Sequence, residues 1–485
     1  MNHKTAHRTS HIAHRTSPPS GGLGGAIFLL GIGGIGMSAL ARYFKSLGKS
    51  VSGYDLTPSP LTEQLMREGI NVFYDDDSTK LPAHIDLAIY TPAVPTDLGL
   101  FKMLAQRGVP MKKRAVVLGE IVAPHETIAI AGTHGKTTTA AILAHIFYQS
   151  KFGCTAFVGG IMNNYESNFF HKRVTDSAQR HRVHGVTQGE VYILEADEYD
   201  RSLLQFKPTV AAINAMDSDH LDIYGTQEAL IETYNLFANQ IDKNGFLVVK
   251  KGLEQHLEVD IEVITVSIED KQAHYYADNI HIVGGYYHFD LHTPQGTIGD
   301  VVFGGGGFVN IGNAVTAAAI ALRYGVDTTT VTAALQSFAG VQRRFQFRIR
   351  HEKMVLIDDY AHHPEEIRMS LRSVRDLYPD KKITAVFQPH LYSRTRDFAD
   401  GFAETLAMAD ELLLLDIYPA RELPVEGVSS KMILSKMTKK NGKLVNKQNL
   451  INEIINVEPQ VVVMLGAGDI DRLVAPVEEA LRAMI

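Results

Sequence analysis

Short apolar runs alternate with amphipathic stretches along the chain from Ala26 onward. This alternation is typical of parallel strands joined by helices, and it predicts the α/β fold class. Breaks in the pattern divide the chain into three domains, at 26–123, 124–340 and 341–485. They follow a tail at 1–25, which we expect to be disordered because too few apolar residues are present to offset the entropy of ordering.

Individual apolar runs locate the strands of the second and third domains. Ala273–Phe303 combines alternating apolar positions with Tyr, His and Gly, which predicts a small β-meander beside the main sheet of the second domain. Long helices are expected at 227–242 and 470–484. Strands are predicted at 127–131, 191–194 and 210–213 in the second domain, and at 354–357, 383–387, 412–415 and 461–465 in the third.

The composition limits the class of protein. Hydrophobic residues at 45% and charged residues at 21% are ordinary for a globular protein, and no apolar run approaches the roughly 18 residues that span a bilayer. A net charge of -7 argues against a broad nucleic-acid surface, which needs clustered Lys and Arg. The single cysteine, Cys154, excludes an intramolecular disulfide and favours a reducing compartment. Because no secretory signal is present, we expect a cytoplasmic protein without membrane insertion.

A glycine motif follows the first predicted strand. Gly31–Gly36 reads GIGGIG, matches the dinucleotide fingerprint G-x-G-x-x-G, and is followed by Asp55 after the next strand. The motif alone indicates NAD, but its glycines and helix N-terminus would accept any diphosphate, including that of a UDP-sugar. A glycine turn that serves only close strand-helix packing is the structural alternative.

A second phosphate motif opens the middle domain. Ala131–Thr138 reads AGTHGKTT between a predicted strand and a helix, although Ile130 stands where the strict P-loop has glycine. Gly135 frees the backbone amides to surround a phosphate, Lys136 offers charge to the β and γ oxygens, and Thr137 can reach Mg²⁺. The alternative is a glycine-capped helix with a solvated lysine. Two phosphate sites on separate domains would exclude a simple dehydrogenase.

Polar residues at strand ends are candidates for metal binding. Glu195 and Asp197 follow the strand at 191–194, where a sheet edge beside a phosphate loop presents carboxylates to Mg²⁺. An acidic surface turn is the alternative. His220 stands among carboxylates after the strand at 210–213, but a single histidine is more often structural than a metal ligand.

Three further groups are candidates for the site. Asn310 and Asn313, one helical turn apart, can contact an adenine or cap their helix. Arg344, at the boundary of the third domain, can reach a transferring phosphate or form a salt bridge in the linker. Asp358–Pro364 and Gln388–Arg396 each end a strand, and ligands bind at such ends in α/β sheets.

The chain resembles the Mur ligases. The phrases GIGGIGMSALA, AGTHGKTTT, EADEYDRS, SDHLDIYG, GVQRRF, DDYAHHP, QPHLYSRT and GAGDI occur in the family's order between residues 31 and 470. The resemblance implies a UDP-sugar-binding Rossmann-like domain at 26–123, a central P-loop ATPase-type parallel sheet at 124–340 and a C-terminal Rossmann-like domain at 341–485. It implies ATP and Mg²⁺ as cofactors, and UDP-N-acetylmuramate and L-alanine as the small-molecule substrates.

The resemblance also implies roles for individual residues. Those expected to bind ATP are Gly132, Thr133, His134, Gly135, Lys136, Thr137, Thr138, Asn310, Asn313, Arg344, Asp359 and Tyr360, and those expected to bind the metal are Thr137, Glu195 and His220. Those expected to contact the sugar nucleotide are Gly33, Gly34, Ile35, Gly36, Ser38, Asp55 and Arg114. Catalytic roles are expected for Lys136, Arg344, His362, His390 and Arg394, the last three with Tyr360 around the incoming alanine.

The reaction expected from this resemblance activates a carboxylate. The lactyl carboxylate of the sugar attacks the γ-phosphorus of ATP, and the amine of L-alanine then attacks the resulting acyl phosphate. A recycling ligase that attaches a preformed tripeptide to the same sugar nucleotide is the nearest alternative. An NAD-dependent oxidoreductase with an ATP-binding module and a nucleotide-binding regulator without turnover are more distant ones.

Overall fold

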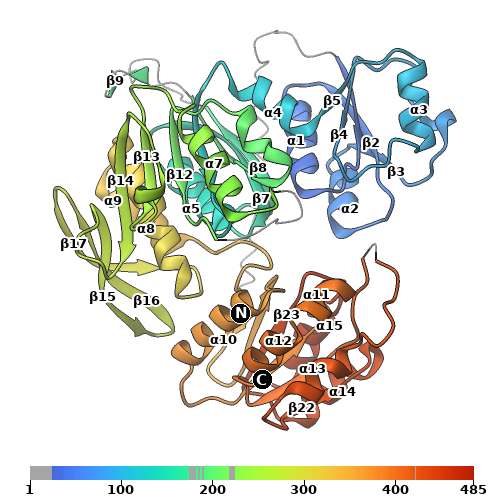
Figure 1. Cartoon of the computed structure of the whole chain (residues 1–485), viewed down its shortest axis with the longest axis vertical. Coiled ribbons are helices and arrows are strands. Elements are labelled where there is room, and N and C mark those ends of the chain that lie inside the picture. The colour runs from blue at the N-terminus through green and yellow to red at the C-terminus, as the bar shows by residue number, and fades with distance from the viewer. Residues whose placement is uncertain (1–24, 174–181, 184–185, 188–189, 218–223, 421) are drawn as a thin grey trace, which may run out of the picture. The chain divides into compact units, whose positions relative to one another are not determined.

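The computed structural model of the chain describes residues 25–173, 182–183, 186–187, 190–217, 224–420 and 422–485. Apart from Gly25, the predicted tail at 1–25 lies outside the described residues, as does His220. The chain separates into two compact units, Met1–Leu118 and Gly119–Ile485. Elements are labelled as in Figure 1.

The first unit is a parallel sheet with strand order β3-β2-β1-β4-β5. The order reverses between β1 and β4, so the carboxyl ends of these two strands form the switch point at which doubly wound sheets bind ligands. This is the expected Rossmann-like arrangement. Its elements are β1 (Ala26–Leu30), α1 (Ile35–Ser46), β2 (Ser50–Tyr54), α2 (Pro60–Arg67), β3 (Asn71–Phe73), β4 (Leu87–Tyr90), α3 (Gly99–Gln106), β5 (Met111–Lys113) and α4 (Arg114–Val122), which continues into the second unit.

The second unit contains a ten-stranded sheet of order β17-β16-β15-β14-β13-β12-β6-β11-β7-β8. The strands from β7 to β15 in this order are parallel, whereas β8, β16 and β17 run antiparallel to their neighbours. The strands are β6 (Glu126–Ala131), β7 (Gly153–Met162), β8 (Ser167–Lys172), β11 (Glu190–Glu195), β12 (Val210–Ile213), β13 (Phe246–Lys250), β14 (Glu262–Ile268), β15 (Tyr275–Val283), β16 (Tyr286–Thr293) and β17 (Gly296–Phe303). The predicted β-meander is confirmed as β15–β17, which are hydrogen-bonded into the main sheet.

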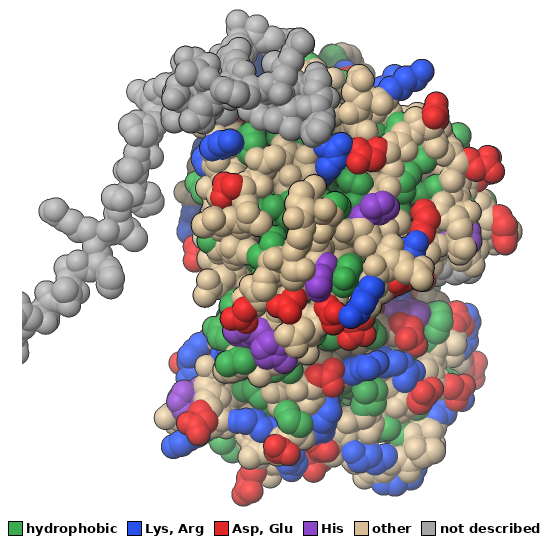
Figure 2. Space-filling model, turned by 90° about the vertical axis from the view of Figure 1, so that its left-hand side faces the viewer, with side chains coloured by type: hydrophobic (Ala, Val, Ile, Leu, Met, Phe, Trp, Pro, Cys, Tyr) green, Lys and Arg blue, Asp and Glu red, His purple; other side chains and the backbone are tan. Residues whose placement is uncertain are grey.

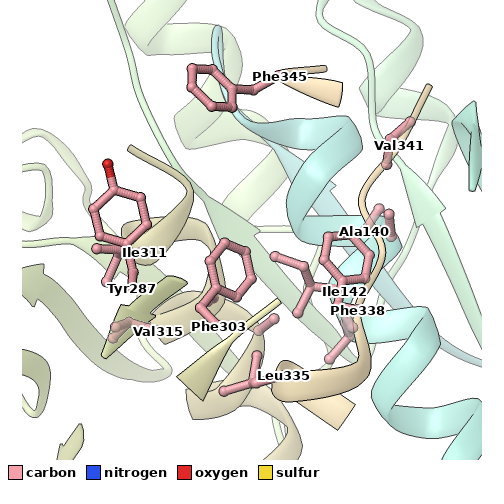
Figure 3. Close-up of a cluster of buried hydrophobic side chains, with 14 of the residues drawn as sticks. Ala140, Ile142, Tyr287, Phe303, Ile311, Val315, Leu335, Phe338, Val341 and Phe345 are labelled. Atoms are coloured by element: carbon pink, nitrogen blue, oxygen red, sulfur yellow. The ribbon is translucent and has the colours of Figure 1, made fainter. Parts of the chain in front are cut away.

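Three helices pack together against this sheet: α5 (Lys136–Gln149), α8 (Val309–Tyr324) and α9 (Thr328–Ser337). Residues of α5 from Thr137 to Phe147 are all buried, as is typical of a helix that is covered on every side. Figure 3 shows Ala140 of α5, Val315 of α8 and Phe303 of β17 in one apolar cluster. The parallel sheet and the meander therefore share a hydrophobic core. A further helix, α7 (Gln227–Ala238), follows β12.

The third domain of the sequence forms a six-stranded sheet of order β18-β19-β23-β20-β21-β22, parallel except for β18. Along β23, Val461 and Val463 pack in one hydrophobic cluster while Val462 packs in another, so both faces of the sheet are covered. This is the expected Rossmann-like arrangement. Its elements are β18 (Gln346–Arg350), β19 (Val355–Asp359), α10 (Pro364–Leu377), β20 (Ile383–Phe387), α11 (Tyr392–Asp397), α12 (Ala399–Leu406), β21 (Glu411–Leu414), α13 (Ser430–Lys436), β22 (Gly442–Leu444), α14 (Leu450–Asn456), β23 (Val461–Leu465) and α15 (Asp471–Arg482).

The surface and the single thiol agree with the composition. The described residues contain no helical segment with the length and hydrophobicity of a transmembrane span. The face drawn in Figure 2 carries Lys and Arg interspersed with Asp and Glu, without one broad basic patch. Cys154 is buried in β7, and burial raises the pKa of its thiol to about 12.

The shared core of the central sheet gives a stability prediction. Phe303 has 0% exposure, and its ring is stacked on Phe338 with centroids 6.1 Å apart. We expect Phe303→Ala to lower the free energy of unfolding by about 3–5 kcal/mol because it leaves a cavity in the core. The midpoint of urea unfolding measures this. Val283→Ala in β15, where the residue is 52% exposed, is the control and should change stability by less than about 0.5 kcal/mol. Equal midpoints for the two variants would contradict the packing described here.

Candidate active site

The loop between β6 and α5 makes a tight turn that favours glycine at two positions. Gly132 and Gly135 have φ of 117° and 79°, a region that residues with side chains rarely adopt. A Cβ at Gly135 would lie 2.4 Å from Oδ1 of Asn313 in α8. The turn therefore brings the N-terminus of α5, with its exposed amide dipoles, to the end of the parallel strands, which favours binding of a phosphate.

The ammonium of Lys136 is held by two partners. It donates to the carbonyl of Gly132 at 2.7 Å and to both carboxylate oxygens of Glu198 at 2.8 and 2.9 Å. Glu198 is 1% exposed, and its backbone carbonyl accepts a hydrogen bond from the Tyr224 hydroxyl at 2.5 Å. Burial raises the pKa of Glu198, while the positive charge of Lys136 opposes that shift.

Glu198 was not among the residues predicted for the site. It stands in the acidic run after β11, and sequence alone does not tell which carboxylate of that run turns inward. Asp197 in the same run accepts from the Tyr199 amide at 3.2 Å, so it stabilises the local turn. The acidic run therefore has two kinds of residue. Glu195 and Glu198 face the loop, whereas Asp197 caps a turn.

Two of the predicted metal ligands lie together. The Thr137 hydroxyl donates to Oε2 of Glu195 at 3.0 Å, and the Gly159 amide donates to the other oxygen of Glu195. Burial raises the pKa of Glu195, and these two hydrogen bonds and the charge of Lys136 act in the opposite direction.

The predicted adenine contacts form a hydrogen-bonded chain. Asn310 donates to the Gly306 carbonyl at 2.6 Å and accepts from the Asn313 amide at 2.8 Å. Asn313 in turn accepts from the Thr139 hydroxyl at 3.2 Å. This chain joins α8 to α5 behind the phosphate loop. Asn310 is buried and lines the adjacent cavity. It supports the loop through its hydrogen bond with Asn313.

A cavity of about 620 Å³ brings many of the predicted ATP-binding residues together. Asp359, at the end of β19, is among its lining residues, and burial raises its pKa to about 6 while the charge of Arg344 opposes the shift. A cavity of this size with convergent polar groups fits a nucleotide. Of the predicted site residues, the lining contains Thr133, His134, Gly135, Lys136, Thr137, Thr138, Asn310, Asn313, Arg344, Asp359 and His362.

The two histidines expected near the alanine are close neighbours. The rings of His362 and His390 have centroids 6.1 Å apart, and Nδ1 of His390 lies 3.5 Å from a guanidinium nitrogen of Arg394. Burial, with the nearby His362 and Arg394, lowers the pKa of His390 to about 4. Burial also lowers the pKa of His362, although Glu366 opposes this shift. Both shifts favour the neutral form of the imidazole.

Tyr360, predicted to contact ATP or the incoming alanine, lies beside two arginines. Its ring lies 5.1 Å from the guanidinium carbons of both Arg343 and Arg344, a cation-π arrangement. Within the part of the chain that the structure describes, Tyr360, His390 and Arg394 are not lining residues of the 620 Å³ cavity. Of these two arginines, Arg344 lines the cavity, so Tyr360 lies next to a lining residue.

The glycine motif of the first unit directly follows β1, at the carboxyl end of one of the two strands that form the switch point. The amides of Gly31 and Ile32 donate to the Tyr54 carbonyl at 2.8 and 3.0 Å, and the Gly33 amide donates to Asp55 at 2.7 Å. A Cβ at Gly36 would lie 2.7 Å from a guanidinium nitrogen of Arg114.

The other predicted contacts of this motif lie in the first turn of α1. Gly34 is the N-cap of that helix, Ile35 is its first residue, and the Ser38 hydroxyl donates to the Ile35 carbonyl at 2.8 Å. A helix N-terminus and an arginine converge there, an arrangement that favours an anion.

Known proteins resemble the chain along almost its whole length. The UDP-N-acetylmuramate–L-alanine ligase of Flavobacterium johnsoniae is 45% identical over 463 residues, which is 95% of this chain and 98% of the relative. The ligase of the same name from Porphyromonas gingivalis is 45% identical over 466 residues, 94% of this chain and 99% of the relative.

Solved structures share the architecture. The UDP-N-acetylmuramate-alanine ligase of Thermotoga maritima has a TM-score of 0.79 and 26% identity, and covers 95% of this chain and 100% of its own. A murein peptide ligase of Psychrobacter arcticus has a TM-score of 0.68 at 22% identity, with 95% and 100% coverage, a likeness in fold alone.

Three family domains match the chain in order. They are described as "Mur ligase family, catalytic domain" at residues 26–126, "Mur ligase middle domain" at 130–321 and "Mur ligase, glutamate ligase domain" at 343–468. These matches cover most of the sequence, and the relatives above agree with them. The chain belongs to the Mur ligase family.

Proposed function

We propose that the chain is an ATP-dependent ligase that joins the lactyl carboxylate of UDP-N-acetylmuramate to the amino group of L-alanine, in the synthesis of cell-wall peptide precursors. Mur ligases are ATP-dependent ligases, and relatives at 45% identity carry the name of this reaction. The structural observation that carries the proposal is the cavity that unites the phosphate loop with Arg344 and Asp359. The ATP requirement and the single buried thiol support a cytoplasmic location.

The phosphate loop supplies the groups that hold ATP. The first turn of α5 offers positive potential, and Lys136 offers an ammonium. Arg344 lines the same cavity and gives a second cation for the charge that develops on the transferring phosphoryl group. Asn310 and Asn313 line the cavity as well, and there we place the adenine.

The Thr137–Glu195 pair fits a Mg²⁺ ion. Both donors are oxygens, and the 3.0 Å between them equals the separation of adjacent ligands around an octahedral ion with bonds of about 2.1 Å. Mg²⁺ bound there would supply neutralisation of phosphate charge. Thr137 and Glu195 would hold it, and the Gly159 amide keeps the Glu195 carboxylate oriented.

The chemistry proceeds in two steps. The lactyl carboxylate attacks the γ-phosphorus of ATP, the bond to the leaving oxygen of ADP breaks, and an acyl phosphate forms. The amine of L-alanine then attacks the acyl carbon, and inorganic phosphate leaves with the electrons of the broken C–O bond. Lys136 and Arg344 stabilise the charge on the phosphoryl oxygens in the first step.

The second step releases a proton from the alanine nitrogen. We assign its acceptance to His362, because this histidine lines the cavity and its lowered pKa favours the neutral ring. The Tyr360 carbonyl lies 2.9 Å from Nδ1 of His362, which leaves Nε2 to accept the proton. His390 and Arg394 lie beside His362, and we place them around the carboxylate of the incoming alanine.

Substrate-dependent phosphate release tests the proposed function. Purified chain with ATP, Mg²⁺ and UDP-N-acetylmuramate should release phosphate when L-alanine is added, and not when D-alanine, a preformed tripeptide or NAD is added instead. Release with the tripeptide but not with L-alanine would identify a recycling ligase. No release with any amine would overturn the ligase assignment.

The phosphate loop predicts the effect of losing its lysine. Lys136→Ala should remain folded yet lower kcat for ATP turnover by roughly 100-fold or more, because a cation on the transferring phosphoryl group is lost. Lys243→Ala, at an exposed turn, is the matched control and should leave turnover unchanged. Retained turnover in Lys136→Ala, with its fold verified by circular dichroism, would remove this loop from the ATP site.

The metal assignment predicts a shift in the Mg²⁺ titration. Glu195→Gln should raise the Mg²⁺ concentration for half-maximal activity by roughly tenfold, if the lost ligand contributes about 1.4 kcal/mol. Asp197→Asn is the control, since Asp197 accepts only from a local backbone amide among the bonds described above. Identical titrations for the parent and Glu195→Gln would exclude Glu195 as a ligand.

The ion pair between Lys136 and Glu198 predicts tighter nucleotide binding when it is weakened. In the free protein Glu198 competes with phosphate for the lysine, so Glu198→Gln should lower the Kd of ATP by roughly tenfold, which is about 1.4 kcal/mol. Calorimetry with ATP measures this, with Glu232→Gln on the exposed side of α7 as control. Weaker binding by Glu198→Gln would show that Glu198 assists the lysine rather than competing for it.

A further inference from the structure

The β-meander carries a group of three side chains that the ligase reaction does not use. His281 lies on β15, His288 on β16 and Asp300 on β17. Figure 1 shows these three strands at one end of the central sheet. None of the three residues lines the 620 Å³ cavity.

The three side chains converge on one point. Each offers a nitrogen or oxygen donor, and the three donor atoms all lie within 4.8 Å of one another. His281 and His288 are direct partners across the antiparallel pair, with ring centroids 5.4 Å apart, and Nδ1 of His288 lies 2.7 Å from Oδ1 of Asp300. Side chains at directly opposed positions point to the same face of a sheet, so both imidazoles are available to one ligand.

Two β-bulges produce this convergence. The register shifts between Asp278 and His281 in the β15–β16 pair, and again between Phe289 and Leu291 in the β16–β17 pair. Asp300 lies in the second bulge with φ of 51°, and its amide donates to Oδ1 of Asp290 at 2.9 Å. A bulge redirects a side chain relative to the regular pleat, and this one brings the Asp300 carboxylate next to His288.

The donors are oriented and accessible. Nδ1 of His281 lies 2.8 Å from the Asn279 carbonyl, a contact that fixes the proton on Nδ1 and leaves Nε2 as a lone-pair donor. The Asp300 side chain is 73% exposed, whereas that of His288 is only 16% exposed. An ion can therefore enter from solvent and still contact a partly buried ligand.

We propose that His281, His288 and Asp300 bind a Zn²⁺ ion that links the three strands of the β-meander. Two imidazoles and one carboxylate suit Zn²⁺, which takes three protein ligands and a water in tetrahedral geometry. They do not suit Mg²⁺, which prefers oxygen ligands. This ion is therefore separate from the Mg²⁺ of the proposed reaction, and the proposal stands independently of it.

A bound ion would stabilise the end of the sheet. A ligand that binds only the folded state adds to its stability in proportion to the logarithm of ligand concentration over Kd. The ion would join strands that are otherwise held by ladder hydrogen bonds and by the apolar contacts of the opposite face. We expect the effect on stability, and no effect on ATP turnover, because the three residues are outside the cavity.

Calorimetric titration with Zn²⁺ in excess Mg²⁺ tests the proposal. The four histidines at positions 3, 7, 11 and 14 are a second source of imidazole ligands, so they are replaced by asparagine in every sample, including the parent. The parent should bind one Zn²⁺ per chain, and His281→Ala and His288→Ala should each raise the Kd by roughly tenfold or more. His292→Ala, on the same strand as His288, is the matched control and should bind as the parent does.

Two further measurements decide the outcome. Zn²⁺ should raise the melting temperature of the parent and leave that of the His281→Ala/His288→Ala variant unchanged, while ATP turnover in Mg²⁺ verifies that the variant is folded. Asp300→Asn, a milder change, should weaken binding and reduce the shift in melting temperature. Equal Zn²⁺ affinity in the parent and the double variant would overturn the proposal, because the ion would then bind elsewhere.

Discussion

Close packing between the phosphate loop and α8 fixes the geometry on which the proposed active site depends. Gly135 lies so near the Asn313 side chain that a Cβ would approach its oxygen to 2.4 Å. Asn313 is held by Asn310, and Asn310 by the Gly306 carbonyl, so the loop rests on a chain of satisfied amides. Because Asn310 and Asn313 both have partners, they hold the loop in one arrangement, which would lower the cost of ordering it in the proposed binding of ATP.

The charges around the loop follow from the same packing. Glu195 and Glu198 are both oriented toward the first turn of α5, where burial disfavours their ionised forms and Lys136 favours them. Lys136 is paired with the Glu198 carboxylate. Polyphosphate and a divalent cation together bring balanced charge to this region, which is why a site of this construction suits magnesium-bound ATP better than a neutral ligand.

Sequence predicted the sheets well where burial alone decides the structure. The strands at 383–387 and 461–465 are continuous apolar runs, and they have those bounds in the structure because both of their faces are covered. The short strand β22 (Gly442–Leu444) was missed because its sequence, Gly-Lys-Leu, has no apolar run.

The site was predictable only in part. Motif residues such as Lys136 do line the cavity. The contact of Lys136 with Glu198 and that of Tyr360 with the arginines could not be predicted, because they depend on the direction in which each side chain points. The convergence of His281 and His288 could not be predicted either, because it depends on a bulge that changes the strand register.

The inert character of Cys154 has a practical consequence. A thiol that is buried in β7 and whose pKa is raised to about 12 has almost no thiolate at neutral pH, and thiolate is the form that reacts with labels and oxidants. The natural protein therefore reacts little with thiol-specific labels. Cysteines introduced at exposed positions, one in each compact unit, would be the reactive thiols, and a dye pair attached to them would report the separation of the two units through the catalytic cycle.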